Sequence, residues 1–392
     1  MKPTAAPLPR RETRCLLTPS DLPASRADFE VIGTFNPAAI ELDDGRVVLL
    51  VRVAERPQEQ RPGYVAAPRY DEQGRIVIDW LPTDGLDTHD PRMAVYRETG
   101  FKRLTFINHL RVVYLASDGR SVASVGPIVD VHADHAMFGL EDPRLTRLGD
   151  TYYVTAVGAS FHGVCTVLLS TRDFETFEDH GIIFCRENKD IVLFPEKIAG
   201  RYAAIHRPTG KFEVQNPEMW LAYSPDLRYW GEHRPLWGSG TARAHRGPDP
   251  TPAEGSGPDQ DDEGSAPPRT ATAWDDGRVG GGVPPIRTDR GWLKIYHASC
   301  RPAPGEPIGV YATGALLLDP QDPARVRAAS PDAFMRPEMD FETRGFVKAV
   351  VFPTGYALRG DELLLYYGAA DTNVGVVAYS MTALLDSLVE VP

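Results

Sequence analysis

The residues best suited to chemistry in this chain are two adjacent acids, Glu141 and Asp142, followed directly by Pro143 and Arg144. A Gly-Asp pair stands shortly after them, between two apolar segments, and is typical of a hairpin turn. The acids therefore stand where a strand begins, a place where proline removes no ladder hydrogen bond. A carboxylate there, beside a fixed cation, could act as an acid or base at the mouth of a β fold. In isolation, such a motif is more often a surface ion pair.

The same local design recurs along the chain, and this favours the functional interpretation. Each copy has a short head, often with proline, then an apolar strand, a glycine turn and an aromatic-rich strand that ends in polar residues. The five heads begin at Phe35, Glu141, Phe194, Pro284 and Phe352. A second element, a strand followed by a Ser- or Thr-rich turn with aspartate and an aromatic residue, occupies 169–177 and 222–230.

Two hairpins per copy, repeated five times, predict an all-β fold, namely a five-bladed β-propeller. We expect an N-terminal arm at 1–28 and a single catalytic domain at 29–392, with a short C-terminal helix starting near Met381. The alternative is a large β-sandwich, or two sandwiches. It is less well supported, because a sandwich does not require one polar-ended hairpin design at repeated intervals.

One segment departs from the pattern. Residues 238–272 are rich in Gly, Pro, Asp, Ser and Thr and have almost no large apolar side chains. Such a segment cannot bury enough surface to offset the entropy lost on ordering. It is predicted to be a disordered loop inserted within a blade, because the hairpin pattern resumes at Trp274.

The composition limits the possible partners and location. The net charge of −12 over 392 residues argues against nucleic acids and anionic membranes as partners, while a local basic pocket for a small anion stays compatible. The four cysteines lack the spacing of a zinc site or a disulfide framework. No signal peptide or membrane-spanning run is recognisable, so a cytoplasmic protein is expected. Oligomeric state is left open, and the arm could serve an interface in a homo-oligomer.

In a propeller, the innermost strand of each blade lines a central channel, so polar residues at the heads should meet at one mouth. We expect this pocket to hold one main carboxylate and several cations. That combination is typical of an acid catalyst beside a bound anion, since Arg and Lys satisfy phosphate oxygens best. A glycosidase would need a second acid to activate water, and the sequence offers three candidates: Glu141, Glu196 and Asp371.

The ordered set of motifs resembles glycoside hydrolase family 130, the β-mannoside phosphorylases and β-mannosidases. The matching stretches follow one another from residue 35 to about residue 380 and so cover nearly the whole chain. They include Phe35-Asn-Pro-Ala-Ala, Leu50-Val-Arg-Val-Ala-Glu-Arg, Glu141-Asp-Pro-Arg, Glu187-Asn-Lys-Asp-Ile-Val-Leu-Phe-Pro-Glu-Lys-Ile, Ile205-His-Arg-Pro, Arg278-Val-Gly-Gly-Gly-Val-Pro-Pro-Ile, Gly291-Trp-Leu-Lys-Ile-Tyr-His, Val351-Phe-Pro-Thr-Gly and Leu365-Tyr-Tyr-Gly-Ala-Ala-Asp-Thr.

The resemblance implies a five-bladed propeller and an inverting, single-displacement attack at C1 of a β-linked mannosyl residue. It implies that Asp142 is the proton donor and acts through the 3-hydroxyl of the mannose. In the family's phosphorylases inorganic phosphate is the nucleophile, the product is mannose 1-phosphate, and no metal or organic cofactor is needed. A proton donor must carry its proton when it acts, so we expect the pKa of Asp142 to lie above about 4. Arg144 should then turn away or hold the backbone.

The remaining candidates divide into two groups of ligands. The expected sugar ligands are Asn36, Arg52, Asp371, His297 and Tyr296. The expected phosphate ligands are Lys197, His206, Arg207, Arg56 and Asn188. Four of them also have a plainer interpretation: Lys197 as a solvated turn lysine, His206 as a packed histidine, Asp371 as a turn aspartate and Tyr296 as blade core.

Because Lys197, His206, Arg207 and His297 are basic or can become so, phosphate is favoured over water as the nucleophile. We therefore expect an inverting phosphorylase of β-mannosides, with β-1,2-linked manno-oligosaccharides as the suggested substrate. The alternatives are a β-mannosidase on the same scaffold and a non-catalytic sugar-binding propeller. The linkage and the acceptor sugar cannot be read, because the extended region 65–131 is expected to shape the acceptor subsite.

Overall fold

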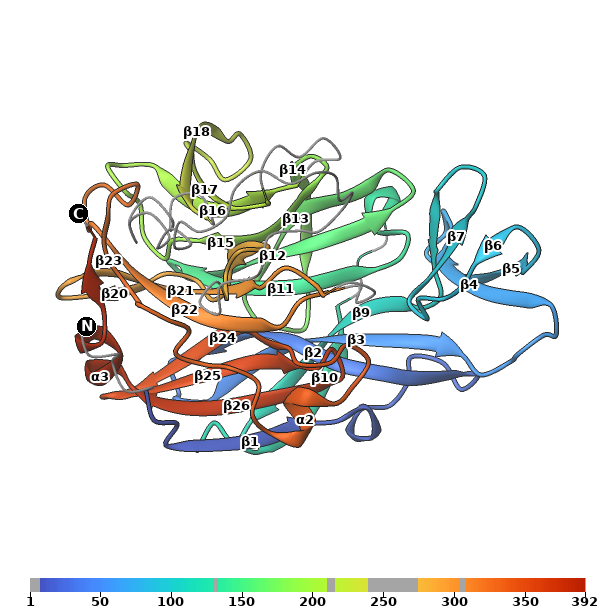
Figure 1. The fold of residues 1–392 in the computed structure, drawn as a ribbon, viewed down its shortest axis with the longest axis horizontal. Coiled ribbons are helices and arrows are strands. Elements are labelled where there is room, and N and C mark those ends of the chain that lie inside the picture. The colour runs from blue at the N-terminus through green and yellow to red at the C-terminus, as the bar shows by residue number, and fades with distance from the viewer. Residues whose placement is uncertain are drawn as a thin grey trace, which may run out of the picture.

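The computed structural model describes residues 8–129, 131, 133–209, 216–238, 274–303 and 308–391. The fold is all-β with few helices, as predicted (Figure 1). Nearly all of the predicted inserted loop at 238–272 lies outside the described residues. No helix in the described ranges is long and apolar enough to span a membrane.

Three antiparallel four-stranded sheets form the first part of the chain, each from strands close in sequence. The first contains β2 (Phe29–Glu41), β3 (Val47–Pro57), β9 (Ile107–Leu115) and β10 (Val122–Ile128). The second contains β11 (Leu140–Leu148), β12 (Thr151–Ser160), β13 (Gly163–Thr171) and β14 (Glu178–Phe184). The third contains β15 (Asn188–Leu193), β16 (Tyr202–Pro208), β17 (Met219–Ser224) and β18 (Gly231–Trp237).

Two further sheets complete the series, and both take a strand from an end of the described chain. The fourth contains β19 (Val279–Gly281), β20 (Ile286–Thr288), β21 (Gly291–Ser299), β22 (Tyr311–Leu318), β23 (Val326–Ala329) and β27 (Val389–Glu390). The fifth contains β24 (Val351–Arg359), β25 (Glu362–Ala369), β26 (Asn373–Ser380) and β1 (Glu12–Leu17). The segment predicted as an N-terminal arm thus provides an outer strand, β1, which pairs with β26.

The helical elements are short. Within the described ranges they are two 3₁₀ turns, η1 (Pro19–Asp21) and η2 (Asp134–Ala136), and two α-helices, α2 (Asp340–Thr343) and α3 (Met381–Asp386). The last is the predicted C-terminal helix, and the Ser380 side chain caps it by accepting a hydrogen bond from the Ala383 backbone.

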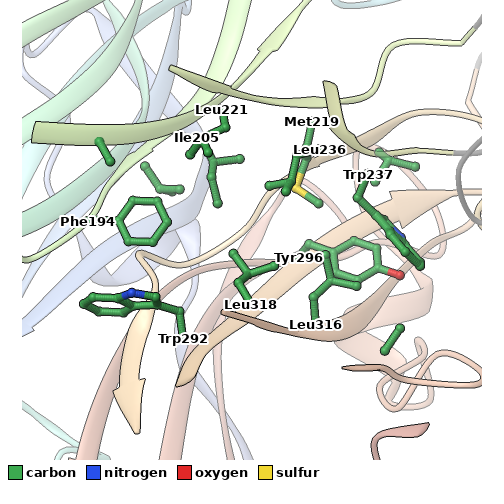
Figure 2. Close-up of a cluster of buried hydrophobic side chains, with 14 of the residues drawn as sticks. Phe194, Ile205, Met219, Leu221, Leu236, Trp237, Trp292, Tyr296, Leu316 and Leu318 are labelled. Carbon is green, nitrogen blue, oxygen red and sulfur yellow. The ribbon is translucent and has the colours of Figure 1, made fainter. Parts of the chain in front are cut away.

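Five apolar clusters join consecutive sheets, because both faces of most strands are buried. In β3, for example, Val48 and Leu50 face the second sheet, while Val47 and Leu49 face the fifth. Figure 2 shows the cluster between the third and fourth sheets, where the rings of Phe194 and Trp292 meet edge to face. Since the fifth sheet packs on the first, the sheets form a closed series.

An extension between β3 and β9 departs from the compact sheets. It contains the hairpin of β4 (Tyr64–Tyr70) and β5 (Ile76–Pro82) and a small sheet of β6 (Leu86–Asp87), β7 (Met93–Tyr96) and β8 (Lys102–Leu104). Figure 1 shows β4 to β7 projecting from one side of the molecule. Several side chains of the β6–β8 sheet and its loops nevertheless reach the cavity described next.

Candidate active site

Three successive sheets share one backbone feature within their first strand. Asn36, Asp142 and Asp190 have φ angles of +48°, +49° and +56°. Each lies in a β-bulge, where the register of β2, β11 or β15 shifts against the next strand. Left-handed backbone is uncommon outside glycine, although Asn and Asp tolerate it best. The bulges turn these three side chains out of the ladder, and all three line one cavity.

This cavity has a volume of about 670 Å³ and is lined by residues of all five sheets together with the extension. Of the predicted site residues it brings together Asn36, Arg52, Asp142, Arg207 and Asp371. Lys189, a weaker pocket candidate on the sequence, lines it as well. Residues that the site prediction did not include also line it: Asp90, Arg92, Lys102, Glu187, Asp190, Arg278 and Tyr311. Lys189 and Asp190 lie within the motif that carries the family resemblance, which was the available signal for them.

Asp142 is held in place by two donors from the first sheet. Its Oδ1 accepts hydrogen bonds from Asn36 Nδ2 and from Arg52 Nη1, each at 2.8 Å. Arg52 also donates from Nε to Asn108 at 2.9 Å and pairs through Nη2 with Glu141 at 3.1 Å. Asp142 is only 7% exposed. The carboxylate is therefore fixed in direction on the cavity wall.

The expected direction of the Asp142 pKa shift is wrong for the protein by itself. Burial raises this pKa, but the charges of Arg52, Arg144 and Lys189 and the hydrogen bond from Asn36 outweigh burial, so the pKa lies below its ordinary value. Asp371 behaves in the opposite way. Burial, opposed by Arg52 and reinforced by the charge of Asp142, raises the pKa of Asp371 to about 6.

Arg144 does not face Asp142, and it holds the backbone as predicted. Its Nη1 donates to the Asp142 carbonyl oxygen at 2.8 Å, and its Nη2 donates to Asp190 Oδ1 at 3.3 Å. The same guanidinium reaches the carbonyl oxygens of Gly281 and Gly282 at 3.2 and 3.4 Å. Arg144 is 1% exposed and thus connects three sheets beneath the cavity.

Lys197 is not at the cavity, which corrects its assignment as a phosphate ligand. It lies beyond the far end of β15, near the turn at Gly200, with its Nζ 4.4 Å from the ring centre of Tyr202. The sequence motif places the third head at Phe194-Pro195, which is a few residues beyond its true position. The structural counterpart of Asn36 and Asp142 is Asp190, which is followed by isoleucine.

His206, Asn188 and Arg56 also lie away from the cavity. His206 Nδ1 lies 2.9 Å from Asn188 Nδ2, and its Nε2 lies 3.1 Å from His233 Nδ1. Burial lowers the pKa of His206 to about 3, so it is a neutral packed histidine. Arg56 pairs with Glu30 at 2.6 Å on the surface.

The predicted sugar ligands Tyr296 and His297 do not line the cavity either. Tyr296 is fully buried in the cluster of Figure 2, and its ring stacks on Trp274. His297 lies behind the wall, with Nε2 3.2 Å from Asp190 Oδ2 and its ring stacked on Phe352. Burial lowers the pKa of His297 to about 4, although Asp190 opposes the shift.

The cavity thus combines a fixed carboxylate with cations suited to an anionic ligand. Lys189 Nζ lies 3.8 Å from Glu141, and Arg207 Nη1 lies 2.8 Å from Asp190. Arg278 and Lys102 also line the space. Of the acids considered for water activation, Glu141 is already paired with Arg52 and Lys189, and Glu196 pairs with Arg287 away from the cavity.

Known proteins resemble the chain along nearly its whole length. A family model described as β-1,4-mannooligosaccharide phosphorylase matches residues 89–245 and 267–390. A β-1,2-mannobiose phosphorylase from Listeria innocua is 36% identical over 97% of this chain and 98% of its own. A 1,2-β-oligomannan phosphorylase from a Thermoanaerobacter species is 33% identical over 65% of this chain and 73% of its own.

A solved structure agrees with these sequence matches. It is that of β-1,2-mannobiose phosphorylase from Listeria innocua in complex with β-1,2-mannobiose, and it superposes with a TM-score of 0.81 at 36% identity. The match covers 95% of this chain and 96% of that one. The chain therefore belongs to glycoside hydrolase family 130.

Proposed function

We propose that the protein is an inverting phosphorylase that cleaves β-1,2-linked manno-oligosaccharides with inorganic phosphate and releases mannose 1-phosphate. The observation that carries the proposal is the buried Asp142 carboxylate, oriented by Asn36 and Arg52 in a cavity that also presents Lys189 and Arg207. The β-1,2 linkage is supported by the 36% identity to the Listeria enzyme over nearly the whole chain.

We also propose that the five sheets are the blades of a five-bladed propeller. Support comes from the apolar clusters, which join each sheet to the next and the fifth sheet to the first. In that arrangement β2, β11 and β15 are inner strands, which explains why Asn36, Asp142 and Asp190 reach one central cavity. β1 then closes the ring by completing the last blade with an N-terminal strand.

In the proposed mechanism Asp142 delivers a proton through the 3-hydroxyl of the mannose as phosphate attacks C1. The donor needs a proton that the protein groups around it do not favour, because Arg52, Arg144 and Lys189 lower its pKa. A phosphate anion placed among the cavity cations offsets their positive potential and so raises the pKa of Asp142. Binding of the nucleophile thereby prepares the acid.

The other cavity residues take roles that follow from their donors and acceptors. Asn36 and Arg52 each orient Asp142 and also bind the sugar. Asp371 accepts hydrogen bonds from sugar hydroxyls. Lys189, Arg207 and Arg278 bind phosphate, with Arg offering paired donors and Lys a compact charge. These cations supply the charge neutralisation, so we propose that phosphate is the co-substrate and that no metal or organic cofactor takes part. The four cysteines without paired spacing support a cytoplasmic location.

A β-mannosidase on this scaffold is the second candidate, and Asp371 is the observation that favours it. Asp371 lines the cavity, and no side-chain hydrogen bond occupies its carboxylate within the described chain. With a pKa of about 6 it could serve as a base for water. The cations beside Asp142 have no task in such a reaction, which is why phosphorolysis is preferred.

Product analysis with and without phosphate separates the two functions. The protein is incubated with β-1,2-mannobiose, β-1,4-mannobiose and a mannosyl-glucose, and the released sugar is identified. We expect mannose 1-phosphate that appears only with phosphate, and fastest from the β-1,2 substrate. Free mannose formed at the same rate without phosphate would overturn the proposal in favour of hydrolysis.

A further inference from the structure

Asp190 shares its backbone position with Asp142, but protein groups contact both of its carboxylate oxygens. Its Oδ2 lies 2.8 Å from Arg207 Nη1 and 3.2 Å from His297 Nε2, and its Oδ1 accepts from Arg144 Nη2 at 3.3 Å. The side chain is 1% exposed. The charges of Arg207, His297 and Arg144 outweigh burial and hold the pKa of Asp190 well below its ordinary range, so Asp190 is an anion inside the wall.

The space around this carboxylate depends on the strand opposite. β19 contributes Gly280, where an added Cβ would lie 2.2 Å from Asp190 Oδ2, 2.5 Å from His297 Nε2 and 2.9 Å from Arg207 Nη1. Gly280 therefore leaves room for the carboxylate and both of its partners to meet. The contact is a close fit between the third and fourth sheets.

Arg207 faces the cavity at one side and Asp190 at the other. A long arginine side chain has several rotamers, and without a fixed anion behind it the guanidinium would lose orientation. The same Asp190 holds Arg144, whose other nitrogen grips the carbonyl of Asp142. One carboxylate thus connects the cation side of the cavity to the backbone of the proposed acid.

We propose that Asp190 is a positioning residue that orients Arg207 for the phosphate nucleophile while Arg144 ties it to the strand of Asp142. The inference rests on the proposed phosphorolysis. It predicts that Asp190 acts mainly on the phosphate step and only weakly on mannoside binding. A merely structural buried carboxylate would instead lower stability without separating the two substrates.

The test is steady-state phosphorolysis of β-1,2-mannobiose by Asp190→Asn, with each substrate varied in turn. If Arg207 loses its orientation, one charge-assisted contact to phosphate is lost, and the KM for phosphate should rise about tenfold. The KM for mannobiose should change less than about threefold. Titration of the variant with inorganic phosphate alone, by calorimetry, should show the same weakening without any turnover.

Glu55→Gln is the matched control. Glu55 is also fully buried and bonded, to the Ser25 backbone and hydroxyl at 2.8 and 2.6 Å, but it does not line the cavity. We expect it to lower the thermal unfolding temperature and leave the KM for phosphate unchanged. Equal changes in both KM values for Asp190→Asn, or an unchanged phosphate affinity, would overturn the inference.

Gly280→Ala keeps the inference testable where Asp190→Asn fails to fold. It removes no charge but pushes methyl volume between Asp190 and Arg207. We expect the KM for phosphate to rise again, and the double variant with Arg207→Lys to rise by less than the product of the single effects. Multiplicative effects would contradict the link. If the wild type forms no phosphate-dependent product, the proposed function itself is refuted. That result differs from one in which the wild type is active and only the Asp190 inference fails.

Discussion

Asp142 and Asp190 occupy the same bulge in neighbouring sheets, yet their surroundings differ. Asp142 shares one oxygen between Asn36 and Arg52 and borders open cavity, whereas Asp190 is surrounded by two arginines and a histidine. One carboxylate borders space that a ligand can enter, and the other is enclosed by cationic partners. The difference shows that the repeated backbone supplies a position, while residues from other strands decide what that position does.

The largest effect should follow from replacing the acid of this pair. Asp142→Asn keeps two hydrogen-bonding positions but cannot deliver a proton, so kcat for β-1,2-mannobiose should fall by about 10²–10⁴. A mannoside with a good leaving group, such as a dinitrophenyl mannoside, should lose much less. Undiminished turnover of mannobiose would show that Asp142 is not the donor and would remove the contrast with Asp190.

Removing the arginine between the two carboxylates should destabilise the fold. Arg144→Met leaves Asp190 without one buried partner, and we expect the free energy of unfolding to fall by about 3–5 kcal/mol in denaturant titrations. Arg147→Met is the control from the same strand, because Arg147 pairs with the exposed Asp43. Its effect should stay within about 0.5 kcal/mol. Equal effects would mean that Arg144 is not the buried connection inferred from its contacts.

The pH dependence of stability should separate Asp371 from both bulge residues. An unfolded aspartate titrates near pH 4, whereas Asp371 in the fold has a pKa of about 6. Between these values the folded protein keeps a proton that the unfolded chain has released, so stability falls as pH rises.

Asp371→Asn removes the titrating group and with it this loss of stability at higher pH. Relative to wild type, the variant should gain about 1–3 kcal/mol of unfolding free energy between about pH 4 and about pH 7. Thermal unfolding across this range measures the difference. A difference that stays constant with pH would contradict the raised pKa.

The smallest effect on the KM for phosphate is expected for Lys197, beyond the far end of β15. Comparing it with Lys189 tests the corrected position of the third head. Lys189→Ala removes a cation from the cavity and should raise the KM for phosphate about tenfold. Lys197→Ala removes one that lies over Tyr202 and should change it less than about twofold. A larger effect of Lys197→Ala than of Lys189→Ala would instead support the third head at Phe194-Pro195, with Lys197 as a phosphate ligand.

The sequence allowed prediction of the repeated hairpins and of the residues that reach the cavity at the first two heads, because Asn36-Pro37 and Asp142-Pro143 share a motif. The third head failed, because Asp190 lacks the following proline and Pro195 offered a false match. The backbone φ angle of Asp190 identifies the true counterpart, and an amino-acid sequence does not display it.

Strand alternation explains most of the other misplaced residues. Neighbouring residues on a strand point to opposite faces, so His206 and Arg207 could not both face one ligand. Tyr296 and His297 also point to opposite faces, one into an apolar cluster and the other toward Asp190, so neither reaches the cavity. Arg56 is on the face of Arg52 but about 13 Å farther along the strand.

The contributions of distant segments could not be read in advance. Arg92 and Lys102 reach the cavity from the extension, and the lowered pKa of Asp142 depends on Arg52 from another sheet. Both effects arise only when separate elements pack together.

The most direct test of the central claim is an NMR time course of β-1,2-mannobiose with wild-type protein and inorganic phosphate. Single displacement with Asp142 as donor predicts that the first product is α-mannose 1-phosphate and that none forms without phosphate. A β-configured product would contradict single displacement, and free mannose released without phosphate would contradict phosphorolysis itself.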